Sequence, residues 1–374
     1  MPRLFFSAGD TSGDQHAARL LTALRERVPE LRAEGLGGPE LAAAGMTLHH
    51  DLVAGAIMGL GPAVAAVPQL LGLLRKVAKH FDRERPDRVV LVDYPGLNLQ
   101  IARLAKRRGI PVSYFVAPQL WAWAPWRARR FARAIDEALV IFPFEVPFFA
   151  TAGLPAHYIG HPLLDALPQH DCTRPEITER VRPVALLPGS RRREVRDNMP
   201  LLLDAAELLT QRHPELSFHC AHVSSEQRER ITDMARGRPI DFTLHDADVH
   251  GVMASCRCAA VASGTATLET GMLGTPLVVF YRISAFEARV AQGLLVPEFI
   301  GQVNLMSGRA LTPELRLPEH DPETLAAALE PLLHDGDAWQ AQRAGLDTLR
   351  ASQRGKGSAV ERAARHLAAH FATA

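Results

Sequence analysis

The strongest constraint on the fold is a strand–turn–helix–strand pattern in residues 259–282. An apolar run ends at Ala262, and the small polar turn 263–265 precedes a helix-compatible run to Leu273 and a second apolar run, 276–281. A crossover helix between two apolar strands is the connection that joins neighbouring parallel strands. The segment therefore predicts a parallel α/β sheet.

The same alternation runs through the chain in two series. We expect strands at 4–8, 88–92, 111–116 and 137–141 in the first series, and at 184–187, 216–221, 259–262 and 277–281 in the second. The polar stretch between the series has no periodicity, which is typical of a linker. The prediction is an α/β protein with two Rossmann-like domains, residues 1–165 and 166–345, a cleft between them, and a helical tail, 346–374.

The composition argues against a nucleic-acid partner, a disulfide framework and a metal site. The 374 residues carry a net charge of +1 and only 6% aromatic side chains, so a nucleic-acid partner is not expected. The four cysteines form no Cys-x-x-Cys pair, which indicates no disulfide framework and fits a reducing compartment. The 16 histidines include no His-Glu-x-x-His, and no metal site is expected.

The stretch Val53–Leu74 contains one strongly polar residue and is followed by Arg75, Lys76 and Lys79. Three interpretations are open: contact with a membrane surface, a buried core helix, or a membrane span. The basic flank favours contact with an anionic membrane surface. Prolines and glycines interrupt the stretch, and a spanning helix inside an α/β series would break the sheet.

Two turns in the second series suit an anion. The turn 263–265 opens a helix, where free backbone N–H groups and the helix dipole favour a diphosphate. Gly189–Arg191 follows the first strand of that series and adds a guanidinium. Glu269 lies one helical turn after the first turn and could accept bonds from sugar hydroxyls. The alternatives are an ordinary capped helix and a solvated basic turn.

Carboxylates follow two strands of the first series. Asp10 and Asp14 lie in the turn after the first strand, and Asp93 ends another. In open α/β sheets, ligands bind at the carboxyl ends of the strands. The first turn does not match G-x-G-x-x-G, so a dinucleotide dehydrogenase is disfavoured.

The ordered motifs together resemble the lipid-A-disaccharide synthase family, inverting glycosyltransferases of the GT-B type. The motifs are Ala8–Asp14, Gly37-Gly38-Pro39, Met58-Gly59, Trp121-Ala122-Trp123, Pro143-Phe144-Glu145, Gly160-His161-Pro162, Leu187–Arg191, Ala262–Glu269, Tyr281-Arg282 and Asn304-Leu305. The resemblance covers nearly the whole chain. One departure concerns chemistry, because Gly96 stands where the family has a carboxylate in its Pro-Asp-Phe-Asn stretch.

The resemblance implies a reaction and its setting. UDP-2,3-diacylglucosamine would react with 2,3-diacylglucosamine 1-phosphate to give the β-1,6 disaccharide phosphate and UDP, without a cofactor. The enzyme would be cytoplasmic and peripheral on the inner face of the inner membrane. The tail helices would return to the first domain or form a homodimer with a partner subunit. Two alternatives stay open: another UDP-sugar enzyme on the same scaffold, and a non-catalytic homologue that binds UDP-sugar or lipid.

Site residues follow from the motifs and their positions. Expected to bind the donor are Gly189, Ser190, Arg191, Ser263, Gly264, Thr265, Glu269, Tyr281, Arg282 and Asn304. Three carboxylates are candidates for the general base. Asp10 is favoured because its glycine-rich turn opens on the expected cleft, Asp93 is a base or an anchor of its turn, and Asp14 is the third candidate.

Overall fold

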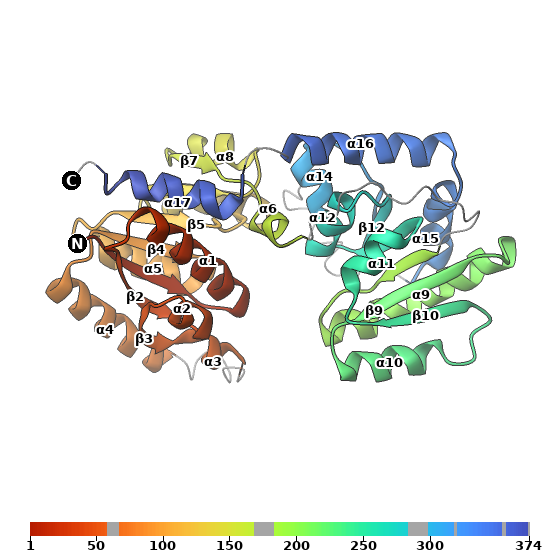
Figure 1. Ribbon diagram of the computed structural model, residues 1–374, viewed down its shortest axis with the longest axis horizontal. Helices are drawn as coiled ribbons and strands as arrows, with labels where there is room; N and C mark the ends of the chain where they lie inside the picture. Colours follow the sequence, from red (N-terminus) through yellow and green to blue (C-terminus); the bar gives the residue numbers. More distant parts are fainter. Residues whose placement is uncertain (58–66, 168–182, 283–297, 318–319, 354–356, 373–374) are drawn as a thin grey trace. The chain divides into compact units, whose positions relative to one another are not determined.

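The computed structural model describes residues 1–57, 67–167, 183–282, 298–317, 320–353 and 357–372. The chain divides into two compact units (Figure 1). Unit 1 comprises Met1–Asp165 and Lys356–Ala374, and unit 2 comprises Ala166–Gly355. Each unit is built on one parallel sheet with helices against it, so the prediction of two Rossmann-like α/β folds is confirmed.

Unit 1 contains a seven-stranded parallel sheet in the order β3-β2-β1-β4-β5-β6-β7. Its strands are β1 (Arg3–Ala8), β2 (Arg32–Gly37), β3 (Thr47–Asp51), β4 (Arg88–Val92), β5 (Val112–Phe115), β6 (Glu137–Val140) and β7 (Ala156–Tyr158). The strand order reverses between β1 and β4. That reversal is the switch point of an open α/β sheet, where ligands characteristically bind.

Helices cover both faces of this sheet. They are α1 (Thr11–Arg27), α2 (Pro39–Ala43), α3 (Leu52–Ile57), α4 (Val67–Glu84), α5 (Pro95–Lys106), α6 (Leu120–Trp123), α7 (Ala128–Ala132), α8 (Glu145–Thr151) and α17 (Ala359–Ala369). Side chains of β1 alternate between two cores: Leu4 and Phe6 pack with α1 and α17, while Phe5 packs with α4 and α5. This double burial explains the unbroken apolar runs in the central strands.

Unit 2 repeats the arrangement with six parallel strands in the order β10-β9-β8-β11-β12-β13. They are β8 (Val184–Leu187), β9 (Ser217–His222), β10 (Asp241–Asp246), β11 (Cys258–Ala262), β12 (Leu277–Arg282) and β13 (Glu314–Leu317). The helices are α9 (Arg192–Arg212), α10 (Ser225–Ala235), α11 (Val249–Ser255), α12 (Thr265–Met272), α14 (Gln302–Ser307), α15 (Pro322–Leu329) and α16 (Asp337–Gln353). The switch point falls between β8 and β11.

The C-terminal helices belong to different units. Helix α16 lies in unit 2, and α17 packs beside α1 on unit 1 (Figure 1). Ala363 and Leu367 of α17 are fully buried in the unit 1 core. Arg27 on α1 forms a 2.9 Å ion pair with Glu361, and Asp165 accepts hydrogen bonds from the backbone at the start of α17.

Every strand expected from the sequence occurs, with no end shifted by more than one residue. Five strands were missed: β2, β3, β7, β10 and β13. The edge strand β3 shows the reason, because its Thr-Leu-His-His-Asp sequence is mostly exposed and lacks an apolar run. Met58-Gly59, most of the linker and the middle of Val53–Leu74 lie outside the described residues. No helix in the described ranges is both long and apolar enough for a membrane crossing.

Candidate active site

A cavity of about 620 Å³ lies in unit 2 at the carboxyl ends of β8 and β11. It is the place that the switch-point rule assigns to a ligand. Seven of the ten donor-binding candidates line it: Gly189, Ser190, Arg191, Ser263, Gly264, Thr265 and Glu269. Residues that sequence reasoning missed also line it, among them Glu194, Gln227, His250 and Gln302.

The turn before α9 already holds an internal anion. The backbone N–H groups of Ser190 and Arg191 donate to Glu194 Oε2 at 3.0 and 3.1 Å. Gly189 has φ +106°, and a Cβ there would lie 2.5 Å from the same carboxylate oxygen, so glycine is required. The Arg191 side chain is 84% exposed and pairs with Glu194 at 3.2 Å. The Glu194 carboxylate thus occupies amides that could bind a phosphate.

The turn before α12 is different. Ser263 is fixed by its backbone N–H, which donates to Phe280 O at 2.8 Å, and by its hydroxyl, which donates to Ile300 O at 3.1 Å. The first-turn N–H groups of Thr265 and Ala266 have no acceptor within the described part of the chain. Helix N-terminal amides without a capping side chain form a ready anion site.

Glu269 lines the cavity one turn into α12. His250, on α11, lies with Nε2 3.3 Å from Glu269 Oε1. The Glu269 side chain is 17% exposed, so its orientation is restricted while part of it faces the cavity. His250 had no distinguishing signal in the sequence, because its approach to Glu269 depends on the packing of α11 against α12.

Three donor-binding candidates are not brought to this cavity. Tyr281 is 43% exposed near the end of β12, and the Arg282 guanidinium donates to Asp197 O. Asn304 is fully buried, where its amide group donates to Thr312 O and Glu314 Oε1 and accepts from two backbone N–H groups. With its amide group used in this way, Asn304 fixes the chain before β13 and does not line the cavity.

In unit 1, the two candidate carboxylates of the first turn have structural partners. Asp10 is the N-cap of α1, with Oδ1 2.6 Å from Gly13 N. Asp14 is 1% exposed and accepts from Gly38 N at 2.7 Å and Glu40 N at 2.9 Å. Asp14 therefore caps α2. Its burial and backbone partners oppose the role of a base that must meet a substrate.

Asp93 lies at the end of β4 in a strained turn. Asp93 and Tyr94 have φ of +43° and +48°, a left-handed conformation that is rare for such residues. The turn is held by Asn98, whose buried amide donates to Asp93 O at 2.7 Å. Burial, together with the negative charge of Asp10, raises the pKa of the Asp93 carboxyl, against a hydrogen bond from the Tyr94 backbone that lowers it.

The turns that carry Asp10 and Asp93 meet through a close contact. A Cβ on Gly9 would lie 2.2 Å from Tyr94 Cγ, so only glycine lets the Tyr94 ring approach this closely. Gly96 is different, because a Cβ there meets no atom within 4 Å. Position 96, where the family resemblance implies a carboxylate, therefore has open space for a side chain.

Several other motif residues form a buried network. Trp121 Nε1 donates to Glu145 Oε1 at 2.9 Å, and Ile141 N and Phe142 N donate to the other oxygen. Burial raises the pKa of Glu145 to about 7 against these hydrogen bonds. His161 packs edge-on against Phe142, and burial lowers its pKa to about 3. These residues hold the chain around β6 and α8.

Solved structures with similar folds are nucleotide-sugar enzymes and glycosyltransferases. A putative UDP-N-acetylglucosamine 2-epimerase from Listeria monocytogenes aligns with a TM-score of 0.64 at 14% identity, over 99% of this chain and 96% of that one. The calicheamicin glycosyltransferase CalG4 aligns with a TM-score of 0.61 at 15% identity, over 100% and 98%. At these identities the likeness concerns the fold, which is that of a GT-B glycosyltransferase.

Sequence comparison defines the family. The profile described as lipid-A-disaccharide synthetase matches residues 4–368. The lipid-A-disaccharide synthase of Syntrophus aciditrophicus is 37% identical over 364 residues, which cover 96% of this chain and 94% of that protein. The chain belongs to the lipid-A-disaccharide synthase family of glycosyltransferases.

Proposed function

We propose that this chain transfers the sugar of UDP-2,3-diacylglucosamine to the 6-hydroxyl of 2,3-diacylglucosamine 1-phosphate, with inversion, to form the β-1,6 disaccharide phosphate and UDP. Family membership supports lipid-A-disaccharide synthase activity on lipid A precursors. The observation that carries the donor half is the unit 2 cavity, where uncapped amides of α12 face the same space as Glu269.

The donor diphosphate binds at the N-terminus of α12 in this proposal. The N–H groups of Thr265 and Ala266 donate to phosphate oxygens, and the exposed Arg191 guanidinium adds a charge-assisted bond. Glu269 accepts hydrogen bonds from ribose hydroxyls, while His250 holds its carboxylate in place. The Glu194 carboxylate must leave the α9 turn before those amides can also contact the diphosphate.

Asp93 is the better candidate for the general base. The sequence favoured Asp10, but Asp10 is the N-cap of α1, whereas burial and the charge of Asp10 raise the pKa of Asp93. A carboxylate with a raised pKa is a stronger base. Asp93 accepts the proton of the 6-hydroxyl as that oxygen bonds to the anomeric carbon, and the carbon–oxygen bond to UDP breaks on the opposite face.

Asp10 and Asp14 act on this centre indirectly. Asp10 maintains the negative charge beside Asp93, and Asp14 ties the first turn to α2. Gly96 leaves vacant the side-chain position that the family fills with a carboxylate, so Asp93 must act without it.

The deciding experiment is the measurement of UDP and disaccharide formation from the two diacylated substrates. Equal amounts of UDP and β-1,6 disaccharide support the transferase. UDP release with a different sugar product indicates another UDP-sugar enzyme, such as an epimerase. Saturable UDP-sugar binding without either product indicates a non-catalytic homologue. Deacylated substrates serve as the control, because a lipid-specific site should use them poorly.

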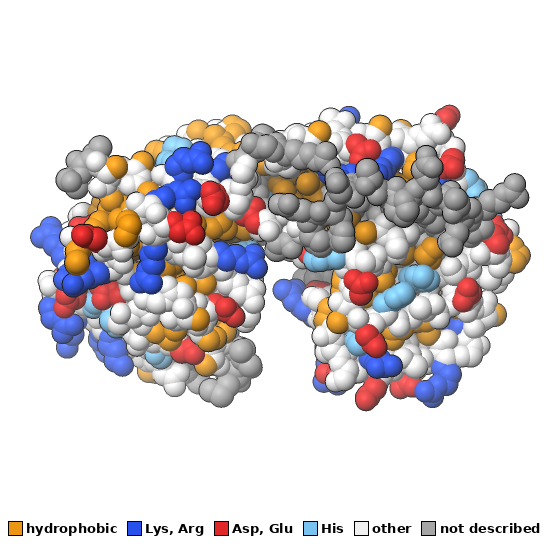
Figure 2. Space-filling view, in the orientation of Figure 1, with side chains coloured by type: hydrophobic (Ala, Val, Ile, Leu, Met, Phe, Trp, Pro, Cys, Tyr) orange, Lys and Arg blue, Asp and Glu red, His pale blue; other side chains and the backbone are white. Residues whose placement is uncertain are grey.

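We further propose that α4 contacts an anionic membrane surface. Leu70 and Leu71 are 38% and 47% exposed, and Arg75, Lys76 and Lys79 follow as exposed cations on the same helix. Figure 2 shows Lys and Arg side chains along the part of unit 1 where α4 lies. Apolar side chains beside cations suit a headgroup boundary. Binding to anionic vesicles that weakens with salt supports this proposal, and no binding to any vesicle contradicts it.

We propose that this contact is with the inner face of the inner membrane, on the cytoplasmic side, where the lipid substrates would lie. A homodimer through the C-terminal tail is a separate proposal. The apolar side of α17 already packs on unit 1, so such a dimer would use other surfaces of α16 or α17. Light scattering of the purified chain distinguishes monomer from dimer.

A further inference from the structure

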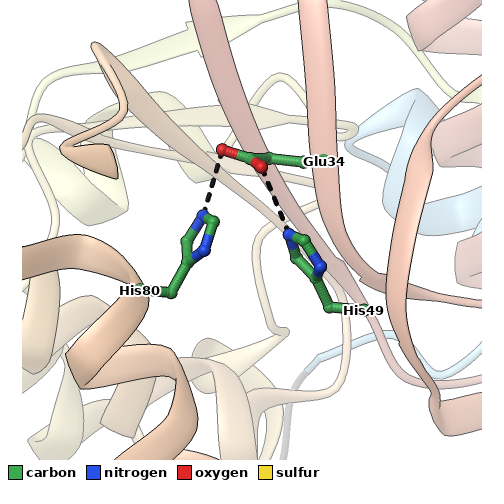
Figure 3. A group of neighbouring side chains, drawn as sticks. All are labelled: Glu34, His49 and His80. Atoms are coloured by element: carbon green, nitrogen blue, oxygen red, sulfur yellow. Dashed lines mark hydrogen bonds and ion pairs between the residues drawn. The ribbon is translucent and has the colours of Figure 1, made fainter. Parts of the chain in front are cut away.

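A cluster of one carboxylate and two imidazoles lies in unit 1, apart from the proposed base. Glu34 comes from β2, His49 from β3 and His80 from α4, and both rings turn toward the carboxylate (Figure 3). Glu34 Oε2 lies 3.2 Å from His49 Nε2, and Glu34 Oε1 lies 3.0 Å from His80 Nε2. The three side chains come from three separate elements, so only the fold assembles this group.

An irregularity in the sheet brings His49 to the cluster. The pairing of β2 with β3 shifts by one residue, from Gly35 opposite Leu48 to Leu36 opposite His50. His49 is thus the extra residue, on β3. Such bulges redirect side chains. As a result, the adjacent His49 and His50 both line one cavity between the sheet and α4, although neighbouring side chains of a regular strand point to opposite faces.

We propose that Glu34, His49 and His80 bind one zinc ion. Zinc takes imidazole nitrogen and carboxylate oxygen at about 2.0–2.2 Å, which places tetrahedral donor atoms about 3.3–3.5 Å apart. The three donor atoms lie within 4.8 Å of one another, so small side-chain rotations close the site. Imidazole ligands favour zinc over magnesium or calcium.

The state of His80 supports a ligand between these groups. Its Nε2 is buried and makes no hydrogen bond to any described residue, although it forms an ion pair with Glu34 Oε1 at 3.0 Å. A buried nitrogen that makes no hydrogen bond is costly. A zinc ion would satisfy the nitrogen lone pair and the carboxylate together. The adjoining cavity of about 510 Å³ gives a fourth ligand access to the ion.

A second cluster within the described residues provides an internal contrast. Glu137, His157 and His366 are also close enough to hold an ion. However, the Arg88 guanidinium donates to Glu137 Oε1 at 2.8 Å, and Ser113 donates to the same oxygen. Burial by itself would raise the pKa of Glu137. Hydrogen bonds from His366 and Ser113, together with the charge of Arg88, outweigh burial and lower this pKa to about 2. A cation already neutralises this carboxylate, which disfavours a metal.

The Glu34 cluster has no arginine on its carboxylate among the described residues. Lys76, Lys79 and Arg83 do line the adjoining cavity, and their charge opposes a divalent ion. The same charge favours an anionic fourth ligand over water. Bound zinc would tie the edge strand β3 and strand β2 to α4, and so stabilise unit 1 at the helix proposed to contact the membrane. The zinc site does not depend on the proposed reaction.

The test is calorimetric titration of the full chain with zinc chloride after removal of metal by EDTA and dialysis. We expect one zinc ion per chain, and an affinity at least tenfold weaker in His80→Gln and Glu34→Gln. His366→Gln is the matched control, because it removes an imidazole from the second cluster. It should bind zinc like the wild type. Cobalt should give the visible absorption of a tetrahedral site in the wild type and lose it in Glu34→Gln.

Thermal unfolding gives an independent measure. Zinc at a hundredfold excess over its dissociation constant should raise the melting temperature by about 5–10 °C for a unit of this size. Absence of zinc binding in the wild type overturns the proposal, as does unchanged binding in a folded Glu34→Gln variant. Loss of binding in His366→Gln alone would assign the ion to the other cluster and equally overturn it. Glu34→Gln, which conserves size, keeps the test valid if His80→Gln fails to fold.

Discussion

The switch points of the two sheets have the same topology and opposite chemistry. In unit 1, the turns after β1 and β4 present Asp10 and Asp93. In unit 2, the turns after β8 and β11 present backbone N–H groups, Arg191 and Glu269 around one cavity. The comparison teaches that an open α/β sheet fixes where a ligand binds, whereas the turn sequences decide whether that place supplies a base or an anion site.

The two units also differ in whether a side chain accepts hydrogen bonds from the free backbone N–H groups of their turns. Asp10 caps α1 in unit 1, and Glu194 fills the corresponding place before α9 in unit 2. The turn before α12 has no such side chain among the described residues. The proposed division of labour, with proton transfer in unit 1 and diphosphate binding in unit 2, can therefore be tested one turn at a time.

The largest effect is expected from Asp93→Asn. Loss of the general base should lower turnover by about 10²–10⁴-fold, while UDP affinity stays unchanged because the donor binds unit 2. Turnover and UDP binding are measured on the same preparation. Asp82→Asn, an exposed carboxylate paired with Arg108, is the control. Near-normal turnover in folded Asp93→Asn would return the role of base to Asp10.

In unit 2 we expect a smaller effect, and on UDP affinity. Glu269→Ala and Arg191→Ala should each weaken UDP binding about tenfold or more, because each loses a charge-assisted hydrogen bond worth roughly 1.5–3 kcal/mol. Calorimetry with UDP measures this effect. Arg193→Ala removes a neighbouring exposed arginine that does not line the cavity, and should bind UDP normally. Unchanged affinity in both test variants would contradict the donor assignment.

A carboxylate at position 96 tests whether a second negative charge assists Asp93 in unit 1. Gly96→Asp should raise turnover by about tenfold, since the site has space for the side chain and a second carboxylate near Asp93 strengthens the base. Gly96→Asn has the same shape without the charge and should leave turnover near the wild-type value. Steady-state rates decide, and equal rates in the two variants would show that charge at this position is irrelevant.

Removal of the Glu194 carboxylate tests whether the turn before α9 in unit 2 can bind the diphosphate. Glu194→Ala frees the N–H groups of Ser190 and Arg191, so UDP should bind about three- to tenfold more tightly. The lost cap should cost about 1 kcal/mol of stability, which chemical unfolding measures. Asp197→Ala, on the same helix but outside the cavity lining, is the control. Weaker UDP binding in Glu194→Ala would mean that Glu194 organises the turn for the donor.

The smallest expected effect is a shift in the pH profile. Asp93 must be deprotonated to act, so activity should fall as the pH drops through its raised pKa. Asp10→Asn removes a negative charge that raises this pKa, and should move the acid limb to lower pH by less than about one unit. The dependence of kcat/KM on pH measures the shift. Abolished activity at every pH would identify Asp10 as the base.

Much of this protein could be read from its sequence. The apolar strands, the two α/β series and the turns at Gly189–Arg191 and 263–265 follow from short-range patterns, because buried parallel strands need apolar runs and strand-end turns need small residues. The motif order also indicated the family. Edge strand β3 escaped notice, since an exposed strand of polar residues has no such pattern.

Only the tertiary structure decided what individual side chains do. Asp14 was a candidate for the general base but caps α2, and Asn304 belongs to a motif but its amide group is fully hydrogen-bonded in the core. The raised pKa of Asp93 depends on burial and on the charge of Asp10, and the meeting of Glu34 with His49 and His80 joins groups from separate elements. Local sequence specifies strands and turns because both depend on the properties of neighbouring residues. Burial, charge and coordination are set by neighbours that only folding brings together.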